Sequence, residues 1–293
     1  ALAGEYTVEA TARRGAAPTP GRARRPAHHH AEVAMPIKQC VIMPIFYRPE
    51  STTLDAFCRE VAAIGFKAVE FFDPGDQLPA IAEAAGRHDL ALASMSGHAS
   101  LTDGLNKVAN HDRIVAELRA RIDLAAQYGV GGLICFSGNR NPGQSDLEGM
   151  IACAQGLRRI VPYAEDKGVN LNMELLNSKV NHPGYQCDRS DWGAALCEMV
   201  NSPRFKLLFD IYHMQIMEGD VIRNIKKYLP YMGHFHTAGN PGRQDMDDTQ
   251  ELNYRGICRA IAESGYDLYM GHEFTPKGDR MAALRAAYET CNV

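Results

Sequence analysis

The chain has 293 residues, of which 45% are hydrophobic, and a net charge of −4 at pH 7. This composition is typical of a globular domain, and the acidic balance argues against a nucleic-acid-binding surface. No apolar stretch in the sequence approaches the roughly 20 residues of a membrane span, so we expect a cytoplasmic protein that does not contact membranes.

Residues 1–34 differ in composition from the rest of the chain. They contain five Arg and three Glu among many Ala, Gly and Pro, without apolar periodicity, so we expect a disordered extension. We interpret His28–His30 as a feature of this tail rather than a metal site, and no apolar run follows the arginine pairs to form a secretory signal. Met35 precedes the first strand pattern and is a candidate natural start, in which case residues 1–34 are not native and 35–293 form one catalytic domain.

Cysteine spacing points to an intracellular enzyme rather than a disulfide framework. None of the eight cysteines forms a CxxC pair, and most lie within apolar strand or helix patterns. Reduced, buried thiols are the best interpretation.

Short apolar runs alternate with helical patterns after Met35. The runs lie at about 38–44, 67–72, 90–95, 131–136, 169–174, 205–210, 232–236 and 268–273. Helical patterns over 51–66, 112–130, 146–169 and 254–266 stop at Gly65, Gly129, Gly168 and Gly265, the third running through Pro162. A helix, a glycine and then a β-rich run is an αβ connection. Eight such units predict a parallel α/β sheet closed into a single-domain barrel, with a doubly wound open sheet as the alternative.

Four acidic or imidazole side chains end four successive apolar runs. They are Glu174, Asp210, His236 and Glu273. Their spacings of 36, 26 and 37 residues are close to one strand–helix unit of about 30 residues. Strand ends of a parallel barrel converge on one mouth, where the long loops over 96–110, 176–186 and 237–253 also lie. We therefore expect the four side chains to meet there.

Three carboxylates and one imidazole suit Mn²⁺ or Mg²⁺ better than a closed structural zinc site, with Co²⁺ or Zn²⁺ as alternatives. Four protein ligands on an octahedral ion leave two positions for the adjacent oxygens of an α-hydroxy carbonyl compound. The ion would act as a Lewis acid and stabilise the enediolate formed when a C–H proton leaves. Glu174 and Glu273 would flank this substrate, one removing the proton and the other returning it.

Each ligand candidate has a simpler interpretation when taken alone. Glu174 could be an exposed strand terminus and Asp210 a helix N-cap. His236 shares strand parity with His234, so we expect both to point inward, where a lone histidine is usually satisfied by hydrogen bonds. Glu273 is again a strand-end residue. The pattern of four at consecutive strand ends favours the metal site.

Other residues near the mouth are candidates for substrate binding. They are His213, Arg243, His182, Asn177 and Tyr185. His213 could contact a hydroxyl or carbonyl group or simply cap its helix, and Arg243 could bind a carboxylate or be a solvated loop residue. Glu70 ends the second strand pattern and could orient a neighbouring side chain.

Five segments carry a resemblance to a known family: ELLNSKVNHPGYQ, FDIYHMQIMEGD, GHFHTAGNPGR, TQELNY and GHEF. From about residue 37 onward the chain resembles the hydroxypyruvate isomerases of the xylose isomerase-like barrel superfamily, which also contains ketose 3-epimerases. The resemblance implies a TIM (β/α)8 barrel whose metal ligands fall on Glu174, Asp210, His236 and Glu273. It also implies that the two glutamates transfer protons and that His213 and Arg243 lie near substrate.

The third ligand departs from part of the family: some members carry Gln at this position, whereas the epimerases carry His, like His236 of this chain. The leading hypothesis is a metal-assisted isomerase of a small hydroxy-carbonyl compound, for example one that converts hydroxypyruvate to tartronate semialdehyde. A ketose 3-epimerase is the close alternative. A phosphodiesterase cutting abasic DNA would need a histidine-rich mouth and basic loops, and a non-catalytic sugar-binding barrel would not need both glutamates. Homo-oligomers are expected by analogy only.

Overall fold

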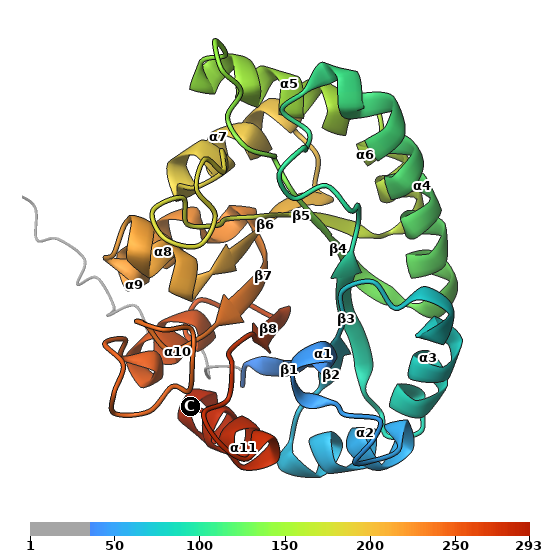
Figure 1. Ribbon diagram of the computed structural model, residues 1–293, viewed down its shortest axis with the longest axis vertical. Helices are drawn as coiled ribbons and strands as arrows, with labels where there is room; N and C mark the ends of the chain where they lie inside the picture. The colour runs from blue at the N-terminus through green and yellow to red at the C-terminus, as the bar shows by residue number, and fades with distance from the viewer. Residues whose placement is uncertain (1–35) are drawn as a thin grey trace, which may run out of the picture. The chain divides into compact units, whose positions relative to one another are not determined.

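The computed structural model describes residues 36–293, and the tail predictions for residues 1–34, including His28–His30, lie outside the described residues. The described residues form a closed barrel of parallel strands surrounded by helices (Figure 1). The strands are β1 (Lys38–Ile42), β2 (Ala68–Glu70), β3 (Ala91–Ser96), β4 (Val130–Cys135), β5 (Asn170–Glu174), β6 (Phe205–Asp210), β7 (Met232–Thr237) and β8 (Tyr269–His272). Each strand pairs with its neighbours in chain order, and β8 closes the ring on β1. The predicted TIM barrel is confirmed and the open sheet is excluded.

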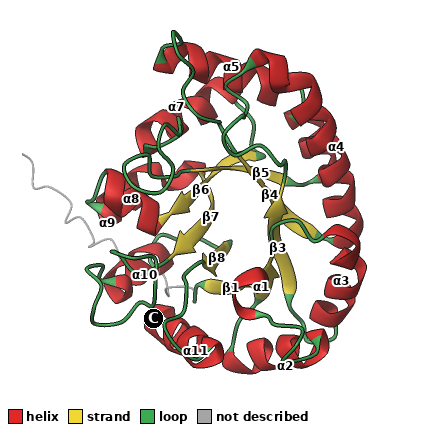
Figure 2. Ribbon diagram, in the orientation of Figure 1, coloured by secondary structure: helices red, strands yellow, loops and turns green. Residues whose placement is uncertain are grey.

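Helices cover the outside of this ring, as the red ribbons around the yellow strands in Figure 2 show. The α-helices are α1 (Met43–Phe46), α2 (Leu54–Ile64), α3 (Leu78–Gly86), α4 (His111–Tyr128), α5 (Asp146–Arg158), α6 (Val161–Lys167), α7 (Ser190–Val200), α8 (Ile211–Met217), α9 (Val221–Tyr228), α10 (Tyr254–Ala262) and α11 (Arg280–Cys291). Three short 3₁₀ helices are η1 (Gly75–Gln77), η2 (Val108–Asn110) and η3 (Leu229–Tyr231). No described helix combines the length and apolar character needed to cross a membrane.

The single helix predicted over residues 146–169 is wrong, because the structure divides it into α5 and α6. Pro162 is the cause. Proline has no backbone N–H and its ring clashes with the carbonyl four residues earlier, so it is tolerated only in the first turn. The chain breaks at Arg159–Ile160 and α6 restarts with Pro162 in its first turn. The predicted stop at Gly168 is correct, and this glycine has a left-handed φ of 73°.

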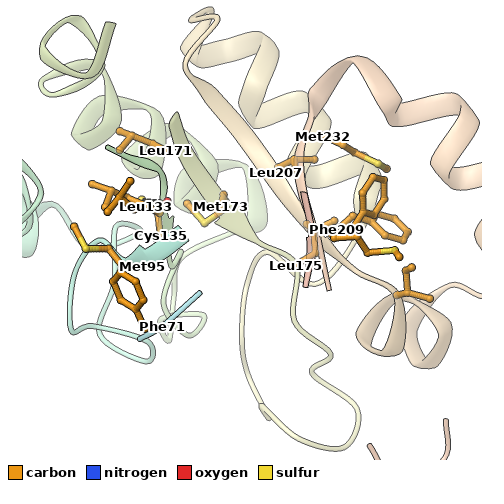
Figure 3. Packing of buried hydrophobic residues seen from close by; sticks show 14 of the residues in the cluster. Phe71, Met95, Leu133, Cys135, Leu171, Met173, Leu175, Leu207, Phe209 and Met232 are labelled. Atoms are coloured by element: carbon orange, nitrogen blue, oxygen red, sulfur yellow. Dashed lines mark hydrogen bonds between the residues drawn. The ribbon is translucent and has the colours of Figure 1, made fainter. Parts of the chain in front are cut away.

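Alternate residues of each strand face two different environments. One set packs against the helices in a large apolar cluster, of which Figure 3 shows Leu133, Leu171, Leu207 and Phe209. The other set faces the barrel interior, where a separate cluster consists of the small side chains Cys40, Ala68 and Ala93. Small interior residues leave room in the barrel axis for polar side chains from other strands. All eight cysteines are buried and free, as predicted.

Candidate active site

The ends of four consecutive strands bring the predicted ligand residues together. Glu174 and Asp210 are the last residues of β5 and β6, His236 lies near the end of β7, and Glu273 directly follows β8. Each offers one ligand atom, and these four atoms all lie within 4.8 Å of one another. This convergence follows from the barrel, because every parallel strand ends at the same mouth.

The site is almost sealed from solvent. Glu174 is 6% exposed, and Asp210 and His236 are each 1% exposed. The Glu273 side chain retains 12% exposure. Three carboxylates this close together and this dry repel one another, so the arrangement requires protonation or a nearby positive charge.

The two glutamates have opposite electrostatic environments. Burial, reinforced by the Glu273 and Asp210 carboxylates, raises the pKa of Glu174 to about 7, although His236 opposes this change. Burial also favours neutral Glu273, but the Arg243 guanidinium and His236 outweigh it and lower the pKa of Glu273 to about 2. One glutamate therefore exchanges a proton near neutral pH while the other stays ionised.

Asp210 has one satisfied oxygen and one free oxygen. Its Oδ1 accepts the backbone N–H of His213 at 3.0 Å and caps α8, which confirms the N-cap interpretation. Its Oδ2 is buried without a hydrogen-bond partner, and burial raises the pKa of this carboxyl group despite the Arg243 charge. A buried orphan carboxylate oxygen is costly unless a ligand satisfies it.

His236 contacts carboxylates through both ring nitrogens. Its Nδ1 lies 3.0 Å from Glu273 Oε2 and 3.6 Å from Glu174 Oε1, and its Nε2 lies 2.9 Å from Glu70 Oε1. Burial alone would lower the pKa of His236, but the Glu70 charge and the bonds to the other two glutamates raise it well above its usual value. The ring is therefore an imidazolium when no cation shares these carboxylates.

The described residues fit a divalent cation on chemical grounds. A mixed set of carboxylate oxygens and one imidazole nitrogen is a donor set that Mn²⁺ and related ions accept. The free Asp210 Oδ2 faces this set, and the Nδ1 proton of His236 is the group that a cation would replace. In a second close group, Cys40, Glu70 and His234, the carboxylate is already engaged by Cys40, His234 and His236.

Arg243 lies over the ligand residues from the long loop after β7. Its Nη2 lies 2.6 Å from Glu273 Oε2 and 4.0 Å from Asp210 Oδ2. The backbone of Arg243 is left-handed, with φ of 55°, and its carbonyl accepts the Thr275 N–H at 2.8 Å. The guanidinium also lies 5.8 Å from the Tyr212 ring centroid, and its Nε is buried without a partner.

Of the other predicted substrate residues, His213 and His182 have unsatisfied nitrogens. Asn177 Nδ2 lies 2.5 Å from His213 Nδ1, which leaves the proton of this ring on Nε2, and that nitrogen is buried without a partner 3.8 Å from Asp210 Oδ2. The Nε2 of His182 is likewise unpartnered. Burial and the Arg243 charge lower the pKa of His213 to about 2. A neutral ring here offers an N–H donor to a ligand oxygen.

Two further candidates for substrate binding, Asn177 and Tyr185, make hydrogen bonds to other protein groups. The Asn177 amide is engaged by His213 and by Asn181 Oδ1 at 2.7 Å, so it orients protein groups. The suggestion that Tyr185 binds substrate is wrong. Its side chain is fully buried, and its hydroxyl donates to the Glu174 carbonyl at 2.9 Å and accepts the Ser137 N–H at 3.1 Å.

Sequence reasoning missed two features of the site. Tyr212 lines the Arg243 side chain, a role that its place beside His213 after β6 could have suggested. A chain of hydrogen bonds also runs behind Glu273, from Thr237 Oγ1 to His272 Nδ1 at 2.7 Å and from His272 Nε2 to Gln39 Oε1 at 2.8 Å. No local signal links Gln39 to His272, because they are distant in sequence.

Comparisons with known proteins agree with this fold. The family model described as xylose isomerase-like TIM barrel matches residues 58–291. The 2-oxo-tetronate isomerase of Cupriavidus necator is 33% identical over 246 residues, covering 80% of this chain and 92% of that protein. The hydroxypyruvate isomerase of Escherichia coli is 26% identical over 235 residues, covering 77% and 89%.

A crystal structure described as AP endonuclease, family 2 from Brucella melitensis has a TM-score of 0.73 at 24% identity, and covers 85% of this chain and 97% of that one. At this identity the likeness concerns the fold. The family model covers most of the described residues, and a relative 33% identical over most of both chains is an isomerase. The chain therefore belongs to the xylose isomerase-like TIM barrel family.

Proposed function

We propose that this protein is a divalent-metal-dependent isomerase that exchanges the neighbouring carbonyl and hydroxyl groups of a small hydroxy-carbonyl acid. Hydroxypyruvate is the proposed substrate and tartronate semialdehyde the proposed product. The observation that carries the proposal is the convergence of the four ligand atoms within 4.8 Å, with two glutamates among them. Relatives named hydroxypyruvate isomerase and 2-oxo-tetronate isomerase support the same reaction class.

The two glutamates suit opposite halves of the proton transfer. Ionised Glu273 can accept the C–H proton, and Glu174, with a pKa of about 7, can return one. In hydroxypyruvate a proton leaves C3 and another arrives at C2, while a hydroxyl proton passes between the two oxygens. A bound divalent cation would supply Lewis-acid polarisation of the carbonyl.

Arg243 and His213 would orient the substrate. The Arg243 guanidinium already binds a carboxylate, Glu273, and its unpartnered Nε is free to donate, so a carboxylate on the substrate matches its chemistry. The neutral His213 ring would donate its Nε2–H to a substrate oxygen. These contacts favour an acid over a neutral ketose.

The test is hydrogen exchange between substrate and deuterated water, read by NMR. With hydroxypyruvate and Mg²⁺, we expect deuterium at C2 of the product and at C3 of the remaining substrate. A chelator should abolish this exchange, and Mg²⁺ or Mn²⁺ should restore it. Full activity in rigorously metal-free protein would contradict the metal-dependent mechanism.

A ketose 3-epimerase is the second candidate, favoured by a histidine rather than a glutamine as the third ligand, His236. Both reactions remove a C–H proton and differ in the carbon that is reprotonated. A screen of three- to six-carbon ketoses and hydroxy-carbonyl acids separates them. Arg243→Gln should raise the KM of an acid by about 10- to 100-fold, the equivalent of one charged hydrogen bond, and leave the KM of a neutral ketose little affected. The comparison is made on KM, because losing the guanidinium that keeps Glu273 ionised lowers kcat for both compounds. No exchange with any compound would favour a non-catalytic sugar-binding barrel.

A further inference from the structure

Glu70 is a charged side chain with no exposed surface, located on β2, outside the four ligand residues. Its Oε1 lies 2.9 Å from His236 Nε2, and its Oε2 lies 2.8 Å from His234 Nε2. A carboxylate whose two oxygens each lie within 3 Å of an imidazole nitrogen accepts a hydrogen bond from each ring, so both of these nitrogens carry an N–H.

This requirement decides which nitrogen of His236 is available to a cation. An imidazole that binds a metal through one nitrogen carries its proton on the other. With the Nε2 proton committed to Glu70, the remaining nitrogen is Nδ1, and Nδ1 is the atom that faces Glu174 and Glu273 at 3.6 and 3.0 Å. A carboxylate that accepts from a metal-binding histidine also makes that histidine a stronger ligand.

The barrel interior makes room for the Glu70 carboxylate at Gly271. A Cβ atom added there would lie 2.9 Å from Glu70 Oε2 and 3.2 Å from His236 Cδ2. These contacts are closer than carbon atoms normally make. A glycine on β8 therefore allows a side chain from β2 to reach β7 across the barrel.

We propose that Glu70 is a positioning residue that holds His236 in the tautomer presenting Nδ1 to the metal site. The hydrogen bond from His234 to the second oxygen, Oε2, fixes the rotation of the Glu70 carboxylate. Glu70 does not touch the substrate or the cation and acts through His236. This inference rests on the proposed metal site and adds the residue that prepares one of its ligands.

The main test measures Mn²⁺ affinity of metal-free protein by calorimetry or electron paramagnetic resonance. Glu70→Gln replaces one acceptor oxygen by an N–H donor of the same shape, so it cannot accept from both histidines. We expect Mn²⁺ affinity to fall by about 10- to 100-fold, as for other residues behind metal ligands. Cys40→Ala is the matched control. Its Sγ lies 3.5 Å from the same Glu70 oxygen, so this variant disturbs the same buried region while keeping both histidine contacts, and its Mn²⁺ affinity should be unchanged.

A second measurement uses wild-type protein and does not depend on a variant folding. In Mg²⁺-loaded protein with ¹⁵N-labelled histidine, NMR should place the His236 proton on Nε2. A proton on Nδ1, or equal Mn²⁺ affinity in Glu70→Gln and wild type, would overturn the role of Glu70. If wild type itself binds no Mn²⁺, the metal site of the proposed function fails before any variant is compared.

Discussion

Asp210 shows how one side chain can serve both the fold and the site. Oδ1 caps α8 by accepting the His213 N–H, and Oδ2 is left for a ligand. Asparagine also caps helices well. Replacing Asp210 by asparagine therefore keeps the cap of α8 but removes the carboxylate oxygen left for a ligand.

We expect Asp210→Asn to reduce Mn²⁺ affinity strongly while leaving the metal-free protein at least as stable as wild type. The cap survives and one of three crowded carboxylates is removed. Asp210→Ala should lose about 1 kcal/mol more, the typical value of an N-cap. Calorimetric titration and thermal unfolding of both variants measure the two effects. A large stability loss in Asp210→Asn would show that the charge supports the fold.

Glu273→Gln should reduce turnover by about 10²- to 10⁴-fold, the range for a lost general acid or base. It should also end deuterium exchange, because the amide cannot accept a C–H proton. The control is Glu251→Gln, which changes an exposed glutamate on the loop after β7. Circular dichroism checks that both variants fold. Near-normal activity of Glu273→Gln would rule out its role in proton transfer.

At this scale the sequence predicted that Glu174, Asp210, His236 and Glu273 converge, because each lies at the end of an apolar run. Their role as metal ligands stays a prediction. The sequence could not predict the Glu70 contacts with His234 and His236. Glu70 is 164 positions from His234 and 166 from His236. The residues meet only because closure of the ring brings the inner faces of β2 and β7 together.

Among the elements, the strand–helix connections depend on a few backbone positions. Gly129 ends α4 with a left-handed φ of 73° before β4 begins, whereas Gly86, the last residue of α3, has no positive φ. A Cβ atom at either position would meet nothing within 4 Å. The two glycines therefore differ in backbone conformation and not in packing.

We expect Gly129→Ala to destabilise the protein by about 1 kcal/mol, since a non-glycine residue is strained in the left-handed region. The matched change Gly86→Ala should stabilise by up to about 1 kcal/mol through helix propensity and reduced freedom of the unfolded chain. Denaturant unfolding of the pair measures the difference. Equal effects would mean that the φ of Gly129 does not constrain the residue there.

The sequence predicted most element ends because glycine stops and N-caps are local signals. Thr53 caps α2 by accepting the Ala56 N–H at 3.2 Å, within the predicted 51–66 pattern. The α5–α6 break was missed because the apolar periodicity continues through Pro162. A pattern of apolar side chains carries no information about the backbone N–H that proline lacks.

For the molecule as a whole, buried neutral histidines couple stability to pH. His98 is 3% exposed, and its ring nitrogens face the N–H groups of Ser100 at 3.3 Å and Phe136 at 3.0 Å. Burial lowers the pKa of His98 to about 4, with Glu117 opposing and Arg113 reinforcing the change. The unfolded chain keeps a histidine pKa of about 6.5.

Between pH about 6.5 and 4 the unfolded state binds a proton at this position that the folded state does not. The free energy of unfolding is therefore unaffected by His98 above pH 6.5. It should decline as pH falls below that value, by roughly 3 kcal/mol from His98 alone. Denaturant midpoints from pH 7.5 to 4.5 measure this slope. His98→Gln should flatten it even if the variant is less stable at every pH. An unchanged slope would assign the acid sensitivity to other groups.

The barrel itself was predictable from repetition, since eight similar units can bury their strands by closing into a ring. The polar interior was predicted only in part. Strand parity placed His234 and His236 on the inner face of their strand, but it did not show that Glu70 lies between them. Small residues such as Cys40 and Ala68 on the inner face leave the room that the charged side chains use.

The ion pair between Arg243 and Glu273 has a consequence for how ligands arrive. An anion reaching the mouth finds Arg243 Nη2 already paired with Glu273, and only the Nε of the guanidinium without a partner. An anion that takes both positions therefore replaces one negative group by another. Selectivity then depends on how well the newcomer matches the carboxylate it displaces, and the displaced Glu273 is left free at the moment the substrate is in position.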